Sequence, residues 1–173
     1  MATHVSNFLQ APEQVLLDLI NADNAKALPL TAVTFAAPAE VVPGEIASTV
    51  VMSATTGSGY KGSQTFTYNR VPLSFMNTNE PDLVIESEEA SVHGLIPFLN
   101  TTFGIQLTAA DIEDTPIEAQ EPDVVKQVTI TAKAGSLVWH GSVTLDITLP
   151  LVDLATLMTV TTLDGLYPPA PAA

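Results

Sequence analysis

The sequence contains no cysteine, only five basic residues and few charged residues of any kind. The absence of cysteine excludes disulfides and thiolate metal sites. Phosphate binding needs clustered lysine and arginine, because affinity grows with the number of phosphates neutralised. The five cations are scattered along the chain: Lys26, Lys61, Arg70, Lys126 and Lys133. We therefore expect neither direct binding of nucleic acid nor docking on an anionic membrane.

Charged residues make up 14% of the chain, against about 25% in a typical soluble domain. Hydrophobic residues make up 46%, and the mean hydropathy is +0.30. Such a chain can bury surface against neighbouring subunits, so the composition favours an oligomer or a lattice. No apolar run reaches the roughly 18 residues that span a bilayer, and we expect no membrane partner. The net charge of −14 fits either a solvated surface or a basic protein partner.

Two parts of the sequence repeat each other in the same order. The pattern aromatic-x-Gly-Ser-x-Thr-apolar occurs at residues 60–66 and again at 139–145. Further matches join residues 19–21 to 98–100, 30–32 to 107–109, 50–54 to 128–132 and 71–73 to 149–151, at offsets of 77 to 79. We interpret this as a tandem duplication of one unit.

Each copy is predicted to contain a helix followed by a β-hairpin. Apolar residues at helical spacing after Pro12 predict a helix over about 12–22. Its counterpart, about 92–102, is capped by Ser91, and Pro97 either kinks it or delays its start. Apolar and polar residues then alternate with period two, which is typical of strands with one buried face. The aromatic residues expected on the buried faces are Tyr60, Phe66, Tyr68 and Trp139.

The predicted fold class is α+β: a tandem duplication of an αββ unit, with antiparallel sheet or sheets, two main helices and a pseudo-twofold. The stretch 83–85 is expected to add an edge strand. The predicted organisation is a first αββ repeat with an N-terminal extension (1–73), a linker (74–90), a second αββ repeat (91–152), and a C-terminal segment with a Pro-rich tail (153–173).

Motifs that carry chemistry are poorly supported. Residues 57–62 spell G-x-G-x-x-G, but the dinucleotide fingerprint must open a helix, and here a period-2 strand follows. His4, His93 and His140 have no partner at metal-ligand spacing. Eleven acidic residues lie between Val71 and Val125 with no lysine or arginine among them, but their spacing does not fit an EF-hand. We predict no catalytic residue, no cofactor and no metal site, and interpret the acidic stretch as a solvated flank or a docking face.

Several stretches resemble small virion structural proteins of tailed bacteriophages. They are residues 19–24 (LINADN), 103–112 (FGIQLTAADI), the Tyr-Lys-Gly-Ser hairpin that ends in residues 68–71 (YNRV), and residues 162–168 (TLDGLYP). The resemblance covers about residues 13–168. It implies a non-catalytic part present in many copies, and it transfers no catalytic residues.

The resulting hypothesis is a bacteriophage virion structural protein, assembled in the bacterial host cytoplasm and located in the virion. Capsid decoration is slightly favoured over a neck, tail or baseplate component. Its partners would be other virion proteins and further copies of itself, as a homo-oligomer or symmetric assembly. The alternatives are a carbohydrate- or host-surface-binding module on a fibre or baseplate, and an enzyme such as a calcium-dependent hydrolase. The residues predicted to form interfaces are Lys61, Thr65, Thr67, Asn69, Glu113, Asp114, His140, Thr144 and Tyr167.

Overall fold

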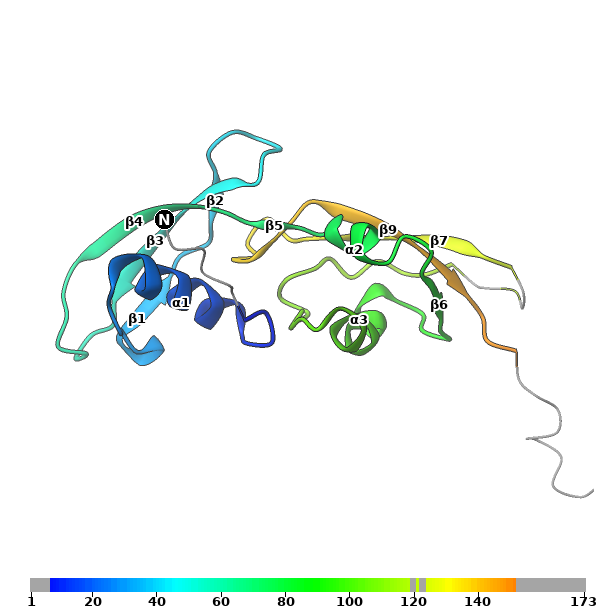
Figure 1. The fold of residues 1–173 in the computed structure, drawn as a ribbon, viewed down its shortest axis with the longest axis horizontal. Coiled ribbons are helices and arrows are strands. Elements are labelled where there is room, and N and C mark those ends of the chain that lie inside the picture. The colour runs from blue at the N-terminus through cyan, green and yellow to red at the C-terminus, as the bar shows by residue number, and fades with distance from the viewer. Residues whose placement is uncertain (1–6, 119–120, 122–123, 152–173) are drawn as a thin grey trace, which may run out of the picture.

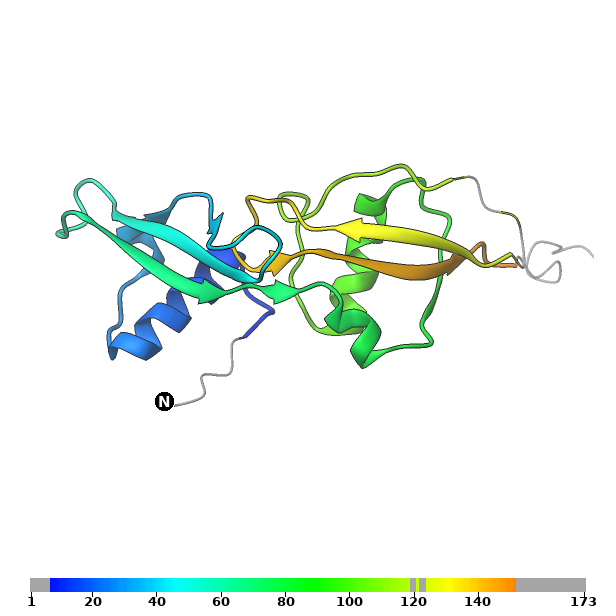
Figure 2. The ribbon, with the colours of Figure 1, turned by 90° about the horizontal axis from the view of Figure 1, so that it is seen from above.

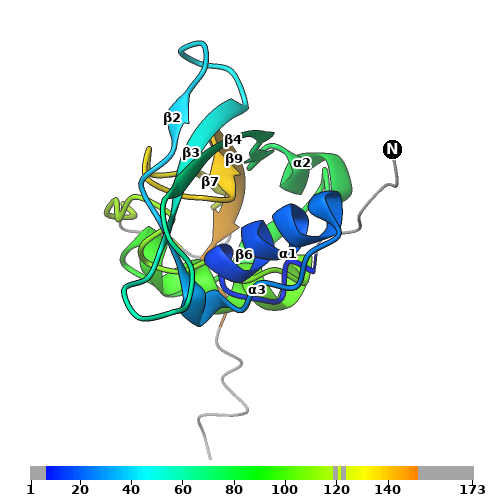
Figure 3. The same cartoon turned by 90° about the vertical axis from the view of Figure 1, so that its left-hand side faces the viewer.

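The structure is a computed structural model that describes residues 7–118, 121 and 124–151. It has a mixed α+β fold drawn out along one axis (Figure 1). The first half comprises residues 7–69, the second half comprises residues 84–151, and a crossover segment, residues 70–83, joins them. The main helices of both halves lie on the same side of the molecule, and the long strands lie on the other (Figures 1 and 3).

The first half is a four-stranded antiparallel sheet centred on one strand. Strand β3 (Ala47–Ala54) pairs with β4 (Ser63–Asn69) along one edge, and β1 and β2 share its other edge. In the β3–β4 hairpin Val50 lies opposite Phe66, and in the β1–β3 pair Val33 lies opposite Ala54. The short elements of this half are η1 (Leu30–Ala32), β1 (Val33–Phe35) and β2 (Ala39–Glu40).

Helix α1 (Pro12–Asn24) packs under this sheet. Proline suits its first turn, where a backbone N–H has no intrahelical partner. Leu16 and Ile20 on its inner face form a buried cluster with Val50 of β3. The helix ends at Ala25, whose φ of 51° is left-handed. The predicted helix over about 12–22 is therefore confirmed.

A loop closed by an asparagine follows α1. The Asn21 side-chain amide donates to the carbonyl of Leu28 (2.9 Å), and its Oδ1 accepts from the Leu28 N–H (3.0 Å). Two hydrogen bonds from one side chain tie the loop to the helix end and satisfy backbone groups that would otherwise be unpaired.

The second half contains a three-stranded sheet in the order β6-β9-β7. Strand β9 (Ser142–Thr148) pairs antiparallel with β7 (Lys126–Thr131), with Val128 opposite Leu145, and parallel with β6 (Val84–Glu86). An isolated antiparallel bridge joins Ile112 to Ala132 at the end of β7. The edge strand predicted at 83–85 is thus present, shifted by one residue and running parallel to its neighbour.

The helix of the second half begins as the short 3₁₀ helix η2 (Val92–Leu95) and continues as α3 (Ile96–Phe103). Pro97 sits in the first turn of α3, so the proline delays the α-helix rather than kinking it. Gly104 ends the helix with a left-handed φ of 62°. Asn100 then exchanges two hydrogen bonds with the backbone of Leu107, at 3.0 and 2.7 Å.

The crossover segment carries β5 (Val71–Pro72) and the short helix α2 (Phe75–Asn79). Strand β5 pairs parallel with β8 (Trp139–His140), so the chain leaves β4 and runs directly onto the second half (Figure 2). The expectation of purely antiparallel sheets is wrong at β5–β8 and β6–β9. In each case the chain returns through a long connection instead of a tight turn, which permits parallel pairing.

The largest hydrophobic core lies mainly in the second half and extends into the first. Trp139 is 1% exposed, and its ring contacts those of Phe8 (centroids 5.7 Å apart) and Phe75 (5.9 Å). Val15 of α1 belongs to the same core. Tyr60, which was predicted to be buried like Trp139, is 55% exposed, so that prediction is wrong. It precedes the paired part of β4, and no other described segment covers it.

Candidate functional site

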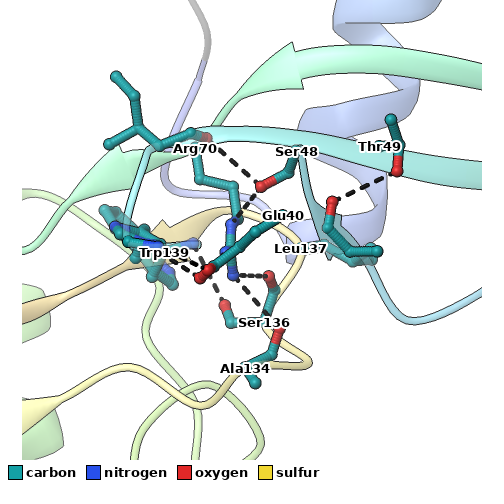
Figure 4. A network of polar contacts seen from close by, with 12 residues as sticks. Glu40, Ser48, Thr49, Arg70, Ala134, Ser136, Leu137 and Trp139 are labelled. Atoms are coloured by element: carbon teal, nitrogen blue, oxygen red, sulfur yellow. Dashed lines mark hydrogen bonds and ion pairs between the residues drawn. The ribbon is translucent and has the colours of Figure 1, made fainter. Parts of the chain in front are cut away.

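A buried arginine lies where the two halves meet (Figure 4). The side chain of Arg70 is 2% exposed. Its Nε donates to Ser48 Oγ (2.9 Å), and its Nη1 donates to the carbonyls of Ala134 (3.3 Å) and Ser136 (3.5 Å). Its Nη2 donates to Glu40 Oε1 (3.1 Å). The guanidinium therefore joins two strands of the first half to the turn before β8 in the second.

Glu40 collects three donors in this network. Oε1 accepts from Arg70 and also lies 3.1 Å from His140 Nε2, while Oε2 accepts from the N–H of Gly44 (2.9 Å). The Gly44 hydrogen bond is the main reason why the pKa of Glu40 is lowered, and His140 and Arg70 lower it further. Glu40 is therefore held as a carboxylate at the junction.

The network continues into the second half through Asp111, which is 3% exposed. Its Oδ1 accepts from Ser136 Oγ (2.8 Å), and its Oδ2 accepts from both the N–H (3.0 Å) and the hydroxyl (2.7 Å) of Thr108. Ser136 Oγ in turn accepts from the N–H of Trp139 (3.2 Å). Asp111, an acidic residue of the stretch considered above, thus holds a turn in place.

Tyr68 adds a direct hydrogen bond between the halves. Its hydroxyl donates to the carbonyl of Leu137 (2.7 Å). Burial raises the pKa of this phenol to about 12, which keeps the donor protonated. Together with Arg70, Tyr68 fastens the end of β4 to the turn before β8. The chemistry of this cluster is structural, since its polar groups are occupied in holding the halves together.

The comparisons with known proteins give one match. The model of a family of unknown function, DUF7941, matches residues 6–173. The chain belongs to this family. No curated protein and no solved structure matches it. The matched stretch includes both halves of the fold and the crossover segment, so the features described here lie within the region that defines DUF7941.

Four of the residues predicted to form interfaces in this DUF7941 chain lie together. Lys61, Thr65, Thr67 and Asn69 are all exposed on β4 or just before it. Strand β4 pairs only with β3 among the described residues, so its other edge is open there. The structure therefore gathers these residues along one free sheet edge.

The remaining predicted interface residues are dispersed. Thr144 is exposed on β9, where its hydroxyl lies 3.1 Å from that of Thr129. Glu113 is also exposed. His140 was predicted to face solvent, but its side chain is only 14% exposed because it packs at the junction against Glu40. Tyr167 lies outside the described residues.

Asp114 is exposed but engaged locally. Its Oδ1 accepts from the N–H of His93 (3.1 Å), and its Oδ2 lies 3.5 Å from His93 Nδ1. The hydrogen bond from the His93 backbone is the main reason why the pKa of Asp114 is lowered. Among residues 7–118, 121 and 124–151, the acidic side chains form no group of three or more ligands that could hold a metal ion.

An apolar loop that was not predicted from the sequence projects from the body between β2 and β3 (Figures 1 and 3). Val41, Val42 and Ile46 in this loop are 52%, 47% and 38% exposed. The signal was the stretch VVPGEI, in which apolar residues flank a Pro-Gly turn and cannot all reach a core. No helix in the described part of the chain is long and apolar enough to cross a membrane.

Proposed function

We propose that this protein is a non-catalytic structural component of a bacteriophage particle, present in many copies and bound to other virion proteins. Capsid decoration is the preferred role, ahead of a neck, tail or baseplate component. The observation that carries the proposal is the edge of β4 that has no partner strand within the described residues and is lined by Lys61, Thr65, Thr67 and Asn69. An unpaired strand edge is a ready template for pairing with another chain.

The distribution of polar and apolar residues between the interior and the surface also supports an assembly role. The polar groups clustered around Arg70 form hydrogen bonds with one another and with the backbone, and these bonds join the halves. The outside carries polar strand faces and the apolar loop with Val41 and Val42. Exposed apolar residues that cluster on a projecting loop are typical of protein–protein contacts. The resemblance to virion proteins of tailed phages supplies the setting.

We further propose that the two halves arose by duplication of one αββ unit. The registers support this. Val50 and Phe66 are partners in the first hairpin, and the residues 78 and 79 positions later, Val128 and Leu145, are partners in the second. The same offsets relate the Val33–Ala54 pair to the Ile112–Ala132 pair.

The helix ends support the duplication independently of the sheets. Asn21 binds the backbone of Leu28, and Asn100 binds the backbone of Leu107, in both cases with two hydrogen bonds across seven residues. The left-handed residues that end the two helices, Ala25 and Gly104, are also 79 positions apart. A shared capping loop at a constant offset is hard to explain by convergence.

Labelling of intact phage with a gold-conjugated antibody against this protein tests the virion proposal. Label over the head is expected for decoration, and label at one end or along the tail for a neck, tail or baseplate component. The decoration version also predicts that recombinant protein binds expanded capsids. Absence of label, with the protein also missing from the mass spectrum of purified particles, would contradict the proposal.

One observation favours the carbohydrate-binding alternative. Tyr60 is 55% exposed beside a hollow of about 320 Å³ that Lys61 and Gln64 also line. Exposed aromatic rings beside polar groups are what sugar sites present. A glycan screen with the wild type and the Tyr60→Ala variant distinguishes the two functions: specific binding lost in the variant would favour the alternative.

A further inference from the structure

The second hairpin is covered by the chain that follows the first hairpin, and this contact has a donor side and an acceptor side. The donor is that chain: β5 and α2 of the crossover segment, and β6, with which the second half begins. The acceptor is the second hairpin, where β8 pairs with β5 and the outer edge of β9 pairs with β6. Within β5–β8 the N–H of Leu73 donates to the carbonyl of His140 (2.9 Å). Leu73 is 0% exposed and Trp139 is 1% exposed, so this docking buries both.

The first hairpin has an equivalent surface, which no segment among the described residues covers. At the offset of 79, Tyr60 and Lys61 stand where Trp139 and His140 stand in the second half. Tyr60 is 55% exposed and Lys61 is exposed as well. The crossover segment covers Trp139, whereas no described segment covers Tyr60.

The outer edge of β4 likewise has no partner strand in the part of the chain that the structure describes. Two hydrogen bonds flank β4: the N–H of Ala54 donates to the carbonyl of Gly62 (3.0 Å), and the N–H of Arg70 donates to the carbonyl of Ile46 (2.9 Å). They show that the backbone groups of every second residue, counted from Gly62 to Arg70, point towards β3. Because the pattern alternates, the backbone groups of Thr67 and Asn69 point to the outer edge. On β9 the residue equivalent to Asn69 is Thr148. Its carbonyl accepts a hydrogen bond from the N–H of Ser87 (3.0 Å), which directly follows β6.

A second donor follows the second hairpin. Residues 149–151 repeat 71–73, and Leu151, the match of the buried Leu73, is 66% exposed. At the same offset of 78, Leu154 matches the buried Met76, and Leu163-Asp164 matches Ile85-Glu86 of β6. Other positions of this segment differ, and residues 152–173 lie outside the described part of the chain. The end of β9 and strand β4 belong to opposite halves of the elongated molecule (Figures 1 and 2).

From these features we infer that the protein assembles head to tail. The chain that follows β9 in one copy docks on Tyr60, Lys61 and the outer edge of β4 in a second copy, as the crossover segment docks on β8 and β9 within one chain. The inference rests on the proposed duplication, and it deepens the proposed function by naming a second copy as the partner. Such a heterologous contact produces rings if its rotation closes and filaments if it does not.

Charge complementarity supports this docking. Within the chain, Glu40 lies 3.1 Å from His140 across the junction. Pro38-Ala39-Glu40 is matched at the offset of 78 by Pro116-Ile117-Glu118. The contact between copies would therefore set Glu118 of one copy against Lys61 of the next, and both side chains are exposed in the single chain. The pair Glu118 and Lys61 between copies would thus take the place that Glu40 and His140 have within one chain.

A charge-swap experiment on the full chain tests the inference by sedimentation velocity. The wild type is expected to form species larger than a monomer, in proportions that rise with concentration. Lys61→Glu and Glu118→Lys each place like charges together and should weaken association by about tenfold or more. An equimolar mixture of the two variants should assemble again, because every contact in an alternating chain pairs opposite charges.

Lys26→Glu is the matched control, because it reverses a charge at the exposed end of α1 outside the contact, and it should assemble like the wild type. Circular dichroism checks that each variant is folded. A wild type that stays monomeric at every concentration overturns the inference, as does a mixture that stays monomeric while the wild type assembles. The sedimentation assay contains no phage particles, so it tests the head-to-tail contact separately from the virion proposal. If the protein stays monomeric in this assay but antibody labelling detects it on phage, the head-to-tail contact is refuted and the virion proposal stands.

Discussion

At the scale of single residues, the junction depends on Arg70. The sequence marks it only as one of five scattered cations, whereas the folded chain buries it against acceptors from both halves. A buried guanidinium is tolerable only when its donors are satisfied. Here Ser48, Glu40 and two backbone carbonyls satisfy them.

Arg70→Met should lower the free energy of unfolding by about 3 kcal/mol, because methionine fills part of the space but leaves buried acceptors without a donor. Urea denaturation followed by circular dichroism measures the change. Lys26→Met, which removes an exposed cation, is the control and should alter stability by less than about 0.5 kcal/mol. Equal effects of the two substitutions would show that the network around Arg70 contributes little.

The ionisation of Glu40 makes the free energy of unfolding depend on pH. Its pKa in the folded chain is lowered below the ordinary value of 4.5, chiefly by the Gly44 hydrogen bond, with His140 and Arg70 also facing it. A carboxyl of this kind stabilises the fold above pH 4.5 and loses that contribution as the pH falls through its lower folded pKa. The wild type should therefore exceed Glu40→Gln in stability at neutral pH, and the difference should shrink in acid. Urea midpoints for both proteins across this range check it; a difference that grows in acid would contradict the assignment.

At the scale of elements, the two helices end in the same geometry with different residues. Gly104 adopts its left-handed φ without steric cost, whereas Ala25 holds a φ of 51° with a side chain in place. Both positions precede a loop that an asparagine closes. The first helix end therefore carries strain that the second avoids.

Ala25→Gly should raise the free energy of unfolding by about 1 kcal/mol, because glycine relieves the left-handed strain. Ala22→Gly, three residues earlier and inside α1, is the matched control and should cost about 1 kcal/mol through lost helix propensity. Thermal and urea unfolding of the two variants beside the wild type would show shifts of opposite sign. Destabilisation by both would mean that the end of α1 is not strained.

Local patterns predicted some elements well and others poorly. The alternation from Trp139 to Leu149 predicted β9 and its buried face, because a strand with one solvent-exposed face must alternate. Pro12 predicted the start of α1 for a similarly local reason. The burial of Tyr60 was predicted by analogy with Trp139 and is wrong, because the crossover segment that covers Trp139 comes from elsewhere in the chain.

At the scale of the whole molecule, the halves share a core and a polar junction. Val15 and Phe8 of the first half pack in the core of the second, and Tyr68 and Arg70 bind its backbone. We therefore expect a single cooperative unfolding transition, with equal calorimetric and van't Hoff enthalpies. Two separated transitions in differential scanning calorimetry would mean that the halves are independent domains. The predicted domain boundaries stay predictions until that measurement.

Three features could be predicted from the sequence alone: the presence of helices and strands, the order of helix and hairpin in each half, and the exposure of Thr65 and Thr67. These features follow from periodicity and residue type along a short stretch of chain. The fold establishes that β5 crosses to β8 and that His140 turns inward to Glu40. It also establishes that, among the described residues, the outer edge of β9 is covered by β6 whereas that of β4 has no partner. These outcomes depend on contacts between residues far apart in the chain, which a local pattern cannot encode. The same pattern therefore gives a covered surface in one half, and in the other a surface that none of residues 7–118, 121 and 124–151 covers.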